Sequence, residues 1–512
     1  MQFVSCLETL ICELEVKSAY YKIKICDVTR GVSLMVTFPI SVKLSVPLHW
    51  YLRYCDVPVL IDMDMALMVR TFRAGLRRST LVLIVFVAGV FLALHAIRTG
   101  DDTVPQTIFA SFIPVHSSTK TTAIMKSLNY SSTTALTKAQ SAENRFRTRL
   151  QRIQHTCEKK TNLRGIVLKP DCEEPRKNFL NVENKHVVFC AIEKTGSTFW
   201  RRIFQMAANG ADGHPSLIKT ADAYNQIGYR SMENMNWKEI TSVFQTSNSI
   251  MFVRNPYWRL FSGWLDKLYS PNWIYWMIHA DEVARKKGQL YMGECANDVS
   301  FVDFVDHLTD SILDGQCVNG HFSPSHEHCF PCALNVTYVG KYETLKEDTI
   351  SLTQNLGIQL NLKDFERDAA KDAIVDAVDW VFAEKDKIVG CKVTFHCALF
   401  RVWSRLQSRG IISRDIMFPY KSRGEAADVT YDEFYQSLTL AHLNSEASAL
   451  KLGRKKSFAQ AIRSLPDRVI SKIKHAFIDD FEMFDYSLNP LEQDLETLKT
   501  IPGEYLQTCP LV

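Results

Sequence analysis

A short polar run, Lys194-Thr195-Gly196-Ser197-Thr198, contains the residue types that bind phosphate groups. Lysine supplies a full positive charge, and a glycine turn exposes backbone N–H groups to an anion. Ser197 or Thr198 can cap a following helix, whose N-terminus also attracts negative charge. The run therefore predicts a phosphate site, although taken alone it also fits an ordinary strand-to-helix connection with a surface lysine.

Arg254 and Ser262 form a second candidate phosphate site. Arg254 directly follows an apolar run, Ile250 to Val253, which reads as a buried strand. Ser262 lies nearly two helical turns past Pro256, so its hydroxyl can point toward the same anion as the guanidinium. In an open α/β sheet, ligands bind at the carboxyl ends of the strands. Two phosphate sites on one sheet indicate a nucleotide with two separate phosphate groups.

Two strand-turn-helix units must position these residues. Apolar residues follow each polar turn at the spacing of one helical face: Phe199, Trp200, Ile203, Met206 and Ala207 in the first unit, and Leu260, Phe261, Trp264, Leu265 and Leu268 in the second. The loop is not a Walker A sequence, because Lys194 precedes the only glycine of the run. This order argues against an ordinary ATPase or GTPase.

On these motifs the chain resembles the membrane-bound carbohydrate sulfotransferases. Within that family it is most similar to the group that holds the chondroitin and dermatan 4-O-sulfotransferases and the glucuronyl 3-O-sulfotransferases. The resemblance extends over roughly residues 185–356 and 463–486, and three further stretches carry it: residues 300–308, 321–345 and 478–486. Two departures are Glu193, where the family usually has proline, and Phe322, where it usually has tryptophan.

The resemblance implies a co-substrate, 3′-phosphoadenosine 5′-phosphosulfate (PAPS), and no metal. It places Lys194, Thr195, Gly196, Ser197 and Thr198 at the 5′-phosphosulfate, and Arg254 and Ser262 at the 3′-phosphate. The fold it implies is α/β: a three-layer sandwich with a central parallel sheet, the P-loop-like fold of PAPS-dependent sulfotransferases. We expect helices on both faces and PAPS at the carboxyl edge of the sheet.

The reaction that follows is in-line displacement at sulfur by a sugar hydroxyl. Charge grows on the bridging oxygen of the donor, where we expect Lys194 to stabilise it. The hydroxyl is a poor nucleophile and needs a general base, for which His321 is the candidate. Glu193 and His326 are the alternatives. The catalytic residues predicted here are therefore Lys194 and His321.

The expected acceptor is a glycosaminoglycan or related glycan, with O-4 of GalNAc in chondroitin or dermatan first and O-3 of glucuronic acid next. A lumenal glycan kinase and a non-enzymatic glycan-binding protein remain as alternatives. The net charge of +4 is small and does not distinguish between these functions. No nucleic-acid partner is expected. The oligomeric state stays open.

An apolar run at residues 80–97 predicts a transmembrane signal anchor, preceded by a cluster of arginines. A cleaved signal peptide is the alternative. Residues 1–79 read as a cytoplasmic tail or a doubtful N-terminal extension, of which residues 1–62 are the doubtful part. A Ser/Thr-rich lumenal stem should cover 98–150, a catalytic domain 151–490 with a possible insertion at 371–456, and a tail 491–512. This order predicts a single-pass type II protein of the Golgi membrane with a lumenal catalytic domain.

Cysteine usage fits an oxidising lumen, since ten of the 14 cysteines follow the anchor. All but one of the ten are disulfide candidates: Cys157, Cys172, Cys295, Cys317, Cys329, Cys332, Cys391, Cys397 and Cys509. Cys190 lies in an expected buried strand and is interpreted as a free core thiol. A zinc site in the stretch that holds His321, His326, His328, Cys329 and Cys332 is the less favoured interpretation. Asn129 and Asn335 begin glycosylation sequons.

Overall fold

The computed structural model describes residues 9–17, 20–27, 32–39, 141–166, 175–209, 214–286, 288, 295–491 and 509. The chain divides into two compact units, residues 1–117 and 118–512. The expected anchor at 80–97 and most of the expected stem lie outside the described residues. Within the described ranges, no helix is long and apolar enough to cross a membrane.

In the first unit, three strands form an antiparallel sheet in the order β1-β2-β3. These strands are β1 (Thr9–Lys17), β2 (Tyr20–Asp27) and β3 (Val32–Pro39). Each strand pairs with its neighbour along the chain, so the described strands form a simple meander.

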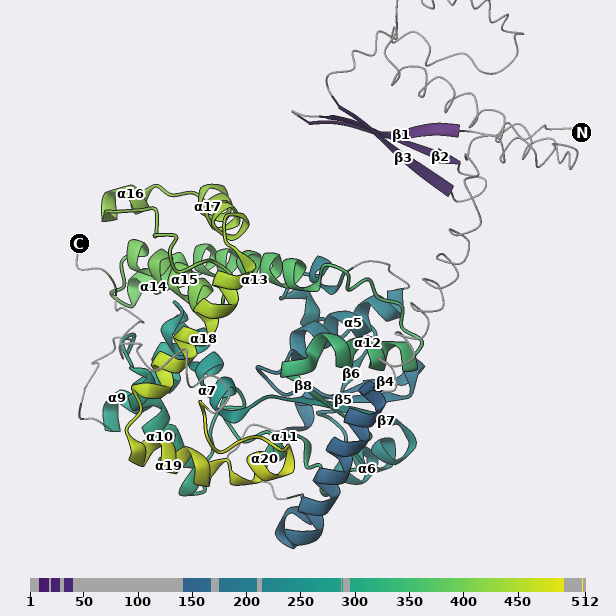
Figure 1. Cartoon of the computed structure of the whole chain (residues 1–512), viewed down its shortest axis with the longest axis vertical. Coiled ribbons are helices and arrows are strands. Elements are labelled where there is room, and N and C mark those ends of the chain that lie inside the picture. Colours follow the sequence, from purple (N-terminus) through teal and green to yellow (C-terminus); the bar gives the residue numbers. More distant parts are fainter. Residues whose placement is uncertain are drawn as a thin grey trace, which may run out of the picture. The chain divides into compact units, whose positions relative to one another are not determined.

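The second unit is built on a five-stranded sheet in the order β6-β4-β5-β7-β8 (Figure 1). Its strands are β4 (Phe179–Val182), β5 (Val187–Cys190), β6 (Arg230–Ser231), β7 (Asn248–Val253) and β8 (Tyr338–Lys341). β5, β7 and β8 run parallel, whereas β4 and β6 pair antiparallel. The expected parallel sheet is thus a mixed one. The short connection of residues 183–186 between β4 and β5 allows only an antiparallel pair.

Helices cover both faces of this sheet because successive residues of β5 point to opposite sides. Val187 and Phe189 pack with α5 (Ser197–Asn209) and α12 (Leu345–Asn355). Val188 and Cys190 pack instead with α6 (Trp237–Thr246) and α11 (His326–Cys329). Both core clusters are buried and apolar, so β5 has the continuous hydrophobic sequence of a strand covered on both faces.

A helix at residues 141–159 covers the outer edge of β8. Arg149 donates a hydrogen bond from Nη1 to the carbonyl oxygen of Val339 in that edge strand, at 3.0 Å. Phe146 and Ile153 of the same helix enter the two core clusters of the sheet. Residues 141–150, assigned from the sequence to the stem, are therefore packed against the catalytic domain.

Residues 371–456, the possible insertion, are helical and have a hydrophobic core of their own. The helices here are α13 (Phe365–Ala383), α14 (Lys385–Gly390), α15 (Phe395–Ser408), α16 (Arg423–Ala427), α17 (Tyr431–Leu443) and α18 (Ala447–Arg463). Trp276 joins this core from the family-like part of the chain. The helical segment therefore packs directly on the sheet-containing part of the unit.

The remaining helices complete the packing around the sheet. They are α7 (Pro256–Trp264), which continues as a π-helical turn (Leu265–Tyr269), α8 (Trp273–Tyr275), α9 (Asp281–Lys286), α10 (Phe301–Leu313), α19 (Asp467–Ala476) and α20 (Ile478–Met483). α7, α10 and α19 share one large apolar core. α7 is thereby held between this core and the end of β7.

Candidate active site

The loop between β5 and α5 carries the first expected phosphate site. Lys194 and Gly196 both have positive φ angles, 67° and 98°, so the backbone turns sharply before α5 begins at Ser197. A side chain at position 196 would have room, because a Cβ there meets only Leu345 at 3.4 Å. The left-handed backbone, and not crowding, therefore favours glycine.

The hydroxyls of this loop have different surroundings. Thr195 is fully buried and donates a hydrogen bond to the carbonyl of Ile192 at 2.8 Å. Its side chain thus stabilises the turn. Ser197 and Thr198 line the cavity in front of the loop, and the Thr198 hydroxyl lies 3.2 Å from that of Tyr224. Of the three hydroxyls, these two can reach a ligand.

Lys194 forms an ion pair that the sequence did not indicate. Its Nζ lies 2.7 Å from Oδ2 of Asp266, in the π-helical turn after α7. The other carboxylate oxygen, Oδ1, accepts a hydrogen bond from Nη1 of Arg405 at 3.0 Å. Burial lowers the pKa of Lys194 to about 8, against the opposing effect of Asp266. Asp266 therefore holds the ammonium in place and favours its charged form.

Arg254 lies directly beside the phosphate loop. Its Nη1 donates to the carbonyl oxygen of Lys194 at 3.2 Å, and its guanidinium covers the ring of Tyr342 at 4.1 Å. Burial lowers the pKa of Arg254 to about 10, so the guanidinium remains charged at neutral pH. Ser262 lines the same cavity from α7. The structure thus brings the two expected phosphate sites together.

The register of the parallel strands explains this proximity. Cys190 of β5 pairs with Met251 of β7, and Val253 of β7 pairs with Lys341 of β8. The three strands therefore end at the same edge of the sheet, where the loop at 191–196, Arg254 and Tyr342 follow them. This is the carboxyl edge at which the sequence predicts the nucleotide.

Glu343 and Asn255 fix the start of α7. Asn255 is the N-cap residue, and its side chain accepts hydrogen bonds from the backbone of Tyr257 and Trp258. Its own N–H donates to Oε1 of Glu343 at 3.0 Å, while the hydroxyl of Tyr486 donates to Oε2 of the same carboxylate. These contacts hold the helix that carries Ser262 at a fixed angle to Arg254.

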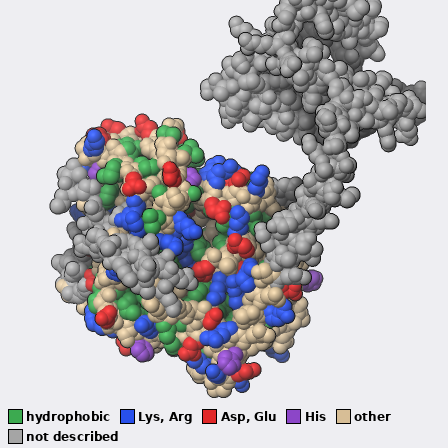
Figure 2. Space-filling view, viewed as in Figure 1, with side chains coloured by type: hydrophobic (Ala, Val, Ile, Leu, Met, Phe, Trp, Pro, Cys, Tyr) green, Lys and Arg blue, Asp and Glu red, His purple; other side chains and the backbone are tan. Residues whose placement is uncertain are grey.

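The residues of both expected phosphate sites meet at one cavity of about 930 Å³. Lys194, Ser197, Arg254, Ser262 and His321 all line it. Its volume lies at the upper end of the range usual for small-molecule sites. Figure 2 shows Lys and Arg side chains gathered around a hollow on one face of the molecule, with acidic side chains between them. The cavity is large enough for a nucleotide together with part of a second substrate.

His321 lies at this cavity as a neutral imidazole. Its Nδ1 is 2.9 Å from Oδ1 of Asn319, which also accepts a hydrogen bond from the backbone N–H of His321. The hydroxyl of Tyr275 lies 3.0 Å from the same nitrogen and can either donate or accept. Because the carboxamide oxygen of Asn319 only accepts, its contact favours the proton on Nδ1 and the lone pair on Nε2. Burial, together with the positive charge of Lys267, lowers the pKa of His321 to about 3. His321 can thus accept a proton at Nε2, but it is a weak base.

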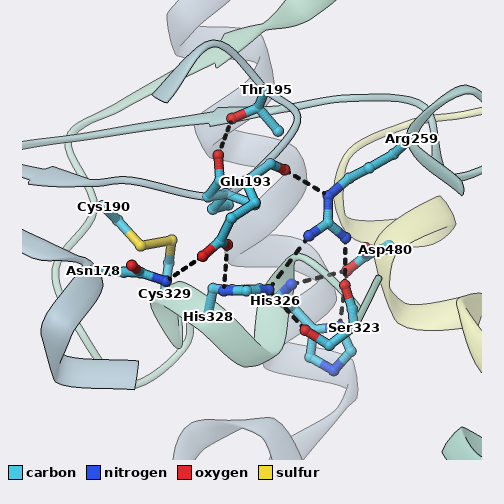
Figure 3. Close-up of a disulfide and its surroundings, with 11 residues drawn as sticks. Asn178, Cys190, Glu193, Thr195, Arg259, Ser323, His326, His328, Cys329 and Asp480 are labelled. Carbon is cyan, nitrogen blue, oxygen red and sulfur yellow. Dashed lines mark hydrogen bonds and ion pairs between the residues drawn. A yellow bond between two sulfur atoms is a disulfide. The ribbon is translucent and has the colours of Figure 1, made fainter. Parts of the chain in front are cut away.

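The two alternative bases lie below the phosphate loop (Figure 3). Glu193 lines the cavity, accepts a hydrogen bond from Asn178 at 3.0 Å, and has Oε2 at 3.6 Å from Nδ1 of His328. Burial raises the pKa of Glu193, but the neighbouring histidines and Arg259 lower it below its ordinary value overall. His326 is bound to Asp480 at 2.8 Å and is not among the cavity-lining residues. Its position makes it the weaker alternative.

Arg259 connects the loop to the segment that carries His321. Its guanidinium donates to three backbone carbonyls, those of Glu193, Gly320 and Ser323 (Figure 3). Arg259 is 2% exposed, and a buried arginine is stabilised when each of its three nitrogens donates in this way. Arg259 therefore holds Lys194 and His321 at a fixed separation without facing the cavity itself.

The cysteines correct one expectation. Cys190, interpreted as a free thiol, forms a disulfide with Cys329 (Figure 3). Three further pairs lie among the described residues: Cys157–Cys332, Cys295–Cys391 and Cys397–Cys509. Cys190 ends β5, and α11 packs across that end, which brings Cys329 within reach although it lies 139 residues away. Because Cys329 and Cys332 are both in disulfides, neither supplies a thiolate to the zinc site considered above.

Three residues that line the cavity were not expected from the sequence: Asp266, Tyr342 and Arg405. A signal existed for Asp266, since it follows Ser262 by four residues on the same helical face. Tyr342 had a weaker signal in its place just after β8. Arg405 had none, because its position depends on how α15 packs against the rest of the domain.

Comparison with known proteins agrees with this geometry. Residues 177–372 match the model of the sulfotransferase family. The chain is 30% identical to human carbohydrate sulfotransferase 9 over 191 residues, which are 36% of this chain and 42% of that protein. It is 26% identical to mouse carbohydrate sulfotransferase 11 over 187 residues, 35% of this chain and 53% of that protein.

A third relative is mouse carbohydrate sulfotransferase 8, 27% identical over 176 residues, 33% of this chain and 40% of that protein. The chain thus matches about half, or less, of the length of these relatives. No solved structure matches it significantly. The phosphate loop, Arg254 and His321 all lie inside the region that matches the family model. The chain therefore carries a sulfotransferase domain and is related to the carbohydrate sulfotransferases.

Proposed function

We propose that this protein transfers a sulfuryl group from PAPS to a hydroxyl of a glycan. The observation that carries the proposal is the meeting of Lys194 and Arg254 in one cavity, at the carboxyl ends of adjacent parallel strands. The family match and the similarity to carbohydrate sulfotransferases support the donor and the class of acceptor.

The residues present fit PAPS in charge and in shape. Lys194 and Arg254 supply two separate positive charges, as a donor phosphorylated at both 3′ and 5′ positions requires. The left-handed turn at Gly196 and the N-terminus of α5 leave backbone N–H groups free to face an anion. When bound, PAPS supplies a sulfuryl group already activated by its link to phosphate.

In the proposed reaction, the acceptor oxygen forms a bond to sulfur while the bond from sulfur to the phosphate oxygen breaks. The leaving oxygen gains negative charge, and the ammonium of Lys194 is the cation placed to stabilise it. Lys194 must turn from Asp266 toward the donor, so Arg405 remains as the partner of that carboxylate. The proton of the acceptor hydroxyl passes to a base.

We assign that base to His321, with Glu193 as the alternative. His321 faces the cavity with Nε2 unprotonated, which is the state that a base requires. Because its pKa is low, His321 binds a proton weakly, which limits its strength as a general base. Glu193 is a carboxylate at the same cavity, and its Oε2 accepts no hydrogen bond. The His321→Ala and Glu193→Gln variants separate the two assignments by their effect on kcat.

As acceptor we propose GalNAc O-4 of chondroitin or dermatan, followed by glucuronic acid O-3. The motif resemblance to both groups of enzymes supports these two candidates.

We also propose that the protein is a single-pass type II protein of the Golgi membrane, with the catalytic domain in the lumen. The apolar run at 80–97 and the disulfides of the catalytic domain support this location.

The first test is transfer of radiolabelled sulfate from PAPS by the protein purified in detergent. The acceptors are desulfated chondroitin, dermatan, heparosan and glucuronyl-terminated glycans, and disaccharide analysis locates the label. We expect label at GalNAc O-4. Label on glucuronic acid would change the acceptor, whereas a folded protein that binds no adenosine 3′,5′-bisphosphate and transfers no label would refute the proposed function.

Substitution of the two cations tests the site. Lys194→Ala and Arg254→Ala should each reduce kcat/KM by roughly a hundredfold or more, since each removes a positive charge that faces the donor. Both variants should be expressed and folded like the wild type, as judged by yield and circular dichroism. Substantial activity in either one would contradict the site assignment.

A further inference from the structure

Two arginines from the helical segment line the nucleotide end of the cavity. They are Arg409, directly after α15, and Arg454, on α18. Both lie beyond residue 372, where the match to the family model ends. Neither belongs to the motifs from which the phosphate sites were predicted. Their role therefore needs an argument of its own.

A close approach of two helices brings these arginines together. Gly410, with φ of 70°, follows Arg409 and touches α18. A Cβ at position 410 would lie 2.6 Å from the carbonyl oxygen of Leu450 and 3.0 Å from Cβ of Arg454. Only glycine permits this approach, so Gly410 holds Arg409 beside Arg454.

The positive charge of the pair is not neutralised by the protein. Two other arginines of the cavity have carboxylate partners: Arg202 pairs with Asp372, and Arg405 with Asp266. Within the described ranges, neither Arg409 nor Arg454 takes part in an ion pair. Arg454 lies with its guanidinium 5.2 Å from the ring of Trp258, a contact that orients it but leaves its N–H donors for a ligand.

The charges of Arg409 and Arg454 converge on the surroundings of Arg254. Burial raises the pKa of the Tyr342 hydroxyl, but the charges of Arg254, Arg454, Arg409 and Lys194 lower it below its ordinary value overall. The charges of Arg454 and Arg409 likewise lower the pKa of Arg254. Three arginines that repel one another around a cavity provide a site for an anion with more than one negative charge.

We propose that Arg409 and Arg454 complete the 3′-phosphate site together with Arg254, so that the helical segment takes part in donor binding. This inference rests on the proposed function, because it takes the donor to be PAPS. The phosphate would be held from two sides: by the end of β7, and by the junction of α15 and α18. The helical segment thereby becomes part of the nucleotide site.

Calorimetric binding of two nucleotides tests the proposal. Adenosine 3′,5′-bisphosphate carries the phosphate in question, and adenosine 5′-monophosphate lacks it. The Arg409→Ala/Arg454→Ala double variant should bind the bisphosphate roughly a hundredfold more weakly, about tenfold for each guanidinium removed. Its affinity for the monophosphate should change less than about threefold. The wild type should therefore prefer the bisphosphate much more strongly than the variant does.

Two further variants serve as controls. Lys451→Ala removes one charge from the exposed surface of the same helix, outside the cavity lining, and should leave both affinities unchanged. Arg409→Lys/Arg454→Lys keeps the charge and should retain part of the preference for the bisphosphate. Unfolding in urea should show equal stability for all variants, because both arginines are exposed.

The possible results separate this inference from the proposed function. A wild type that does not prefer the bisphosphate would refute the PAPS-dependent function itself. A wild type that prefers it, with the double variant unchanged, would refute only the role of the two arginines. An equal loss of affinity for both nucleotides would also overturn the inference, since it would place the arginines away from the 3′-phosphate.

Discussion

Lys194 has to remain charged in surroundings that oppose its charge. Burial favours the neutral amine, and Lys267 and Arg409 repel the ammonium, while Asp266 attracts it. The net result is a pKa of about 8, within the range of an ordinary activity assay. Lys194 is therefore the group whose titration should limit donor binding on the alkaline side.

The first prediction concerns this alkaline limit. A lysine binds an anion only when protonated, and its protonated fraction falls as the pH rises through its pKa. We expect kcat/KM for PAPS to decrease above about pH 8. The measurement is kcat/KM from pH 5 to 9.5 at constant ionic strength. A profile that stays flat to pH 9.5 would show that Lys194 has an ordinary pKa.

Asp266→Asn should move this limit to lower pH. Asp266 raises the pKa of Lys194, whereas burial lowers it. A neutral asparagine at position 266 would no longer oppose the effect of burial, so the ammonium would lose its proton more easily. We expect the alkaline midpoint to fall by roughly one pH unit or more. Asp306→Asn is the matched control, because that carboxylate pairs with Lys472 far from the cavity. A lower rate with an unchanged midpoint would mean that Asp266 acts only on the fold.

His321 leads to a prediction on the acid side. Its pKa of about 3 keeps the imidazole neutral at any pH well above 3, and the pKa of Glu193 is lowered as well. Neither candidate base should therefore become protonated between pH 5 and 7. We expect kcat/KM to be flat across this interval. A decrease with a midpoint near 6.5 would show that His321 has the pKa of an exposed histidine.

At the scale of the elements, the site depends on how tightly the end of β5 is held. The Cys190–Cys329 disulfide joins that end to α11, just before the phosphate loop begins. Arg259 attaches the other side of the loop to the turn at residues 320–323. The loop is thus fixed from behind, while its front faces the cavity.

The Cys190→Ala/Cys329→Ala variant tests this support. The disulfide closes a loop of 139 residues, and its removal should lower the free energy of unfolding by about 2–5 kcal/mol. Urea unfolding under non-reducing conditions measures the change. We also expect weaker binding of adenosine 3′,5′-bisphosphate, because the loop loses its covalent attachment to α11. Unfolding at the same urea concentration as the wild type would contradict the prediction.

The elements also show how far the sequence could predict the site. The proximity of Lys194 and Arg254 was predictable because each lies in the turn that follows its strand, and parallel strands end at one edge. Cys329 as the partner of Cys190, and Arg405 as the partner of Asp266, were not, since both pairs join segments more than 130 residues apart. The antiparallel β4 was also missed, because it belongs to no strand-turn-helix unit: the short connection of residues 183–186 leads from it directly into β5.

At the scale of the whole molecule, the catalytic domain extends further toward the N-terminus than the sequence suggested. Asp348 is fully buried on α12 and pairs with Arg145 and Arg149 of the helix at 141–159. It also accepts hydrogen bonds from the backbone of Lys341 and the hydroxyl of Thr344. The residues beside Arg254 and Tyr342 are therefore connected, through α12, to a helix outside the region that matches the family.

The last prediction follows from this buried carboxylate. Arg149→Ala leaves Asp348 with one partly exposed arginine, and we expect it to lower the free energy of unfolding by roughly 3 kcal/mol. Arg147→Ala, on the exposed side of the same helix, should change stability by less than about 0.5 kcal/mol. The measurement is urea unfolding of residues 118–512. The same comparison applies to a fragment that begins at residue 151, which lacks both arginines and should be less stable still. Equal midpoints for all four proteins would mean that this helix is not part of the cooperative unit that carries the nucleotide site.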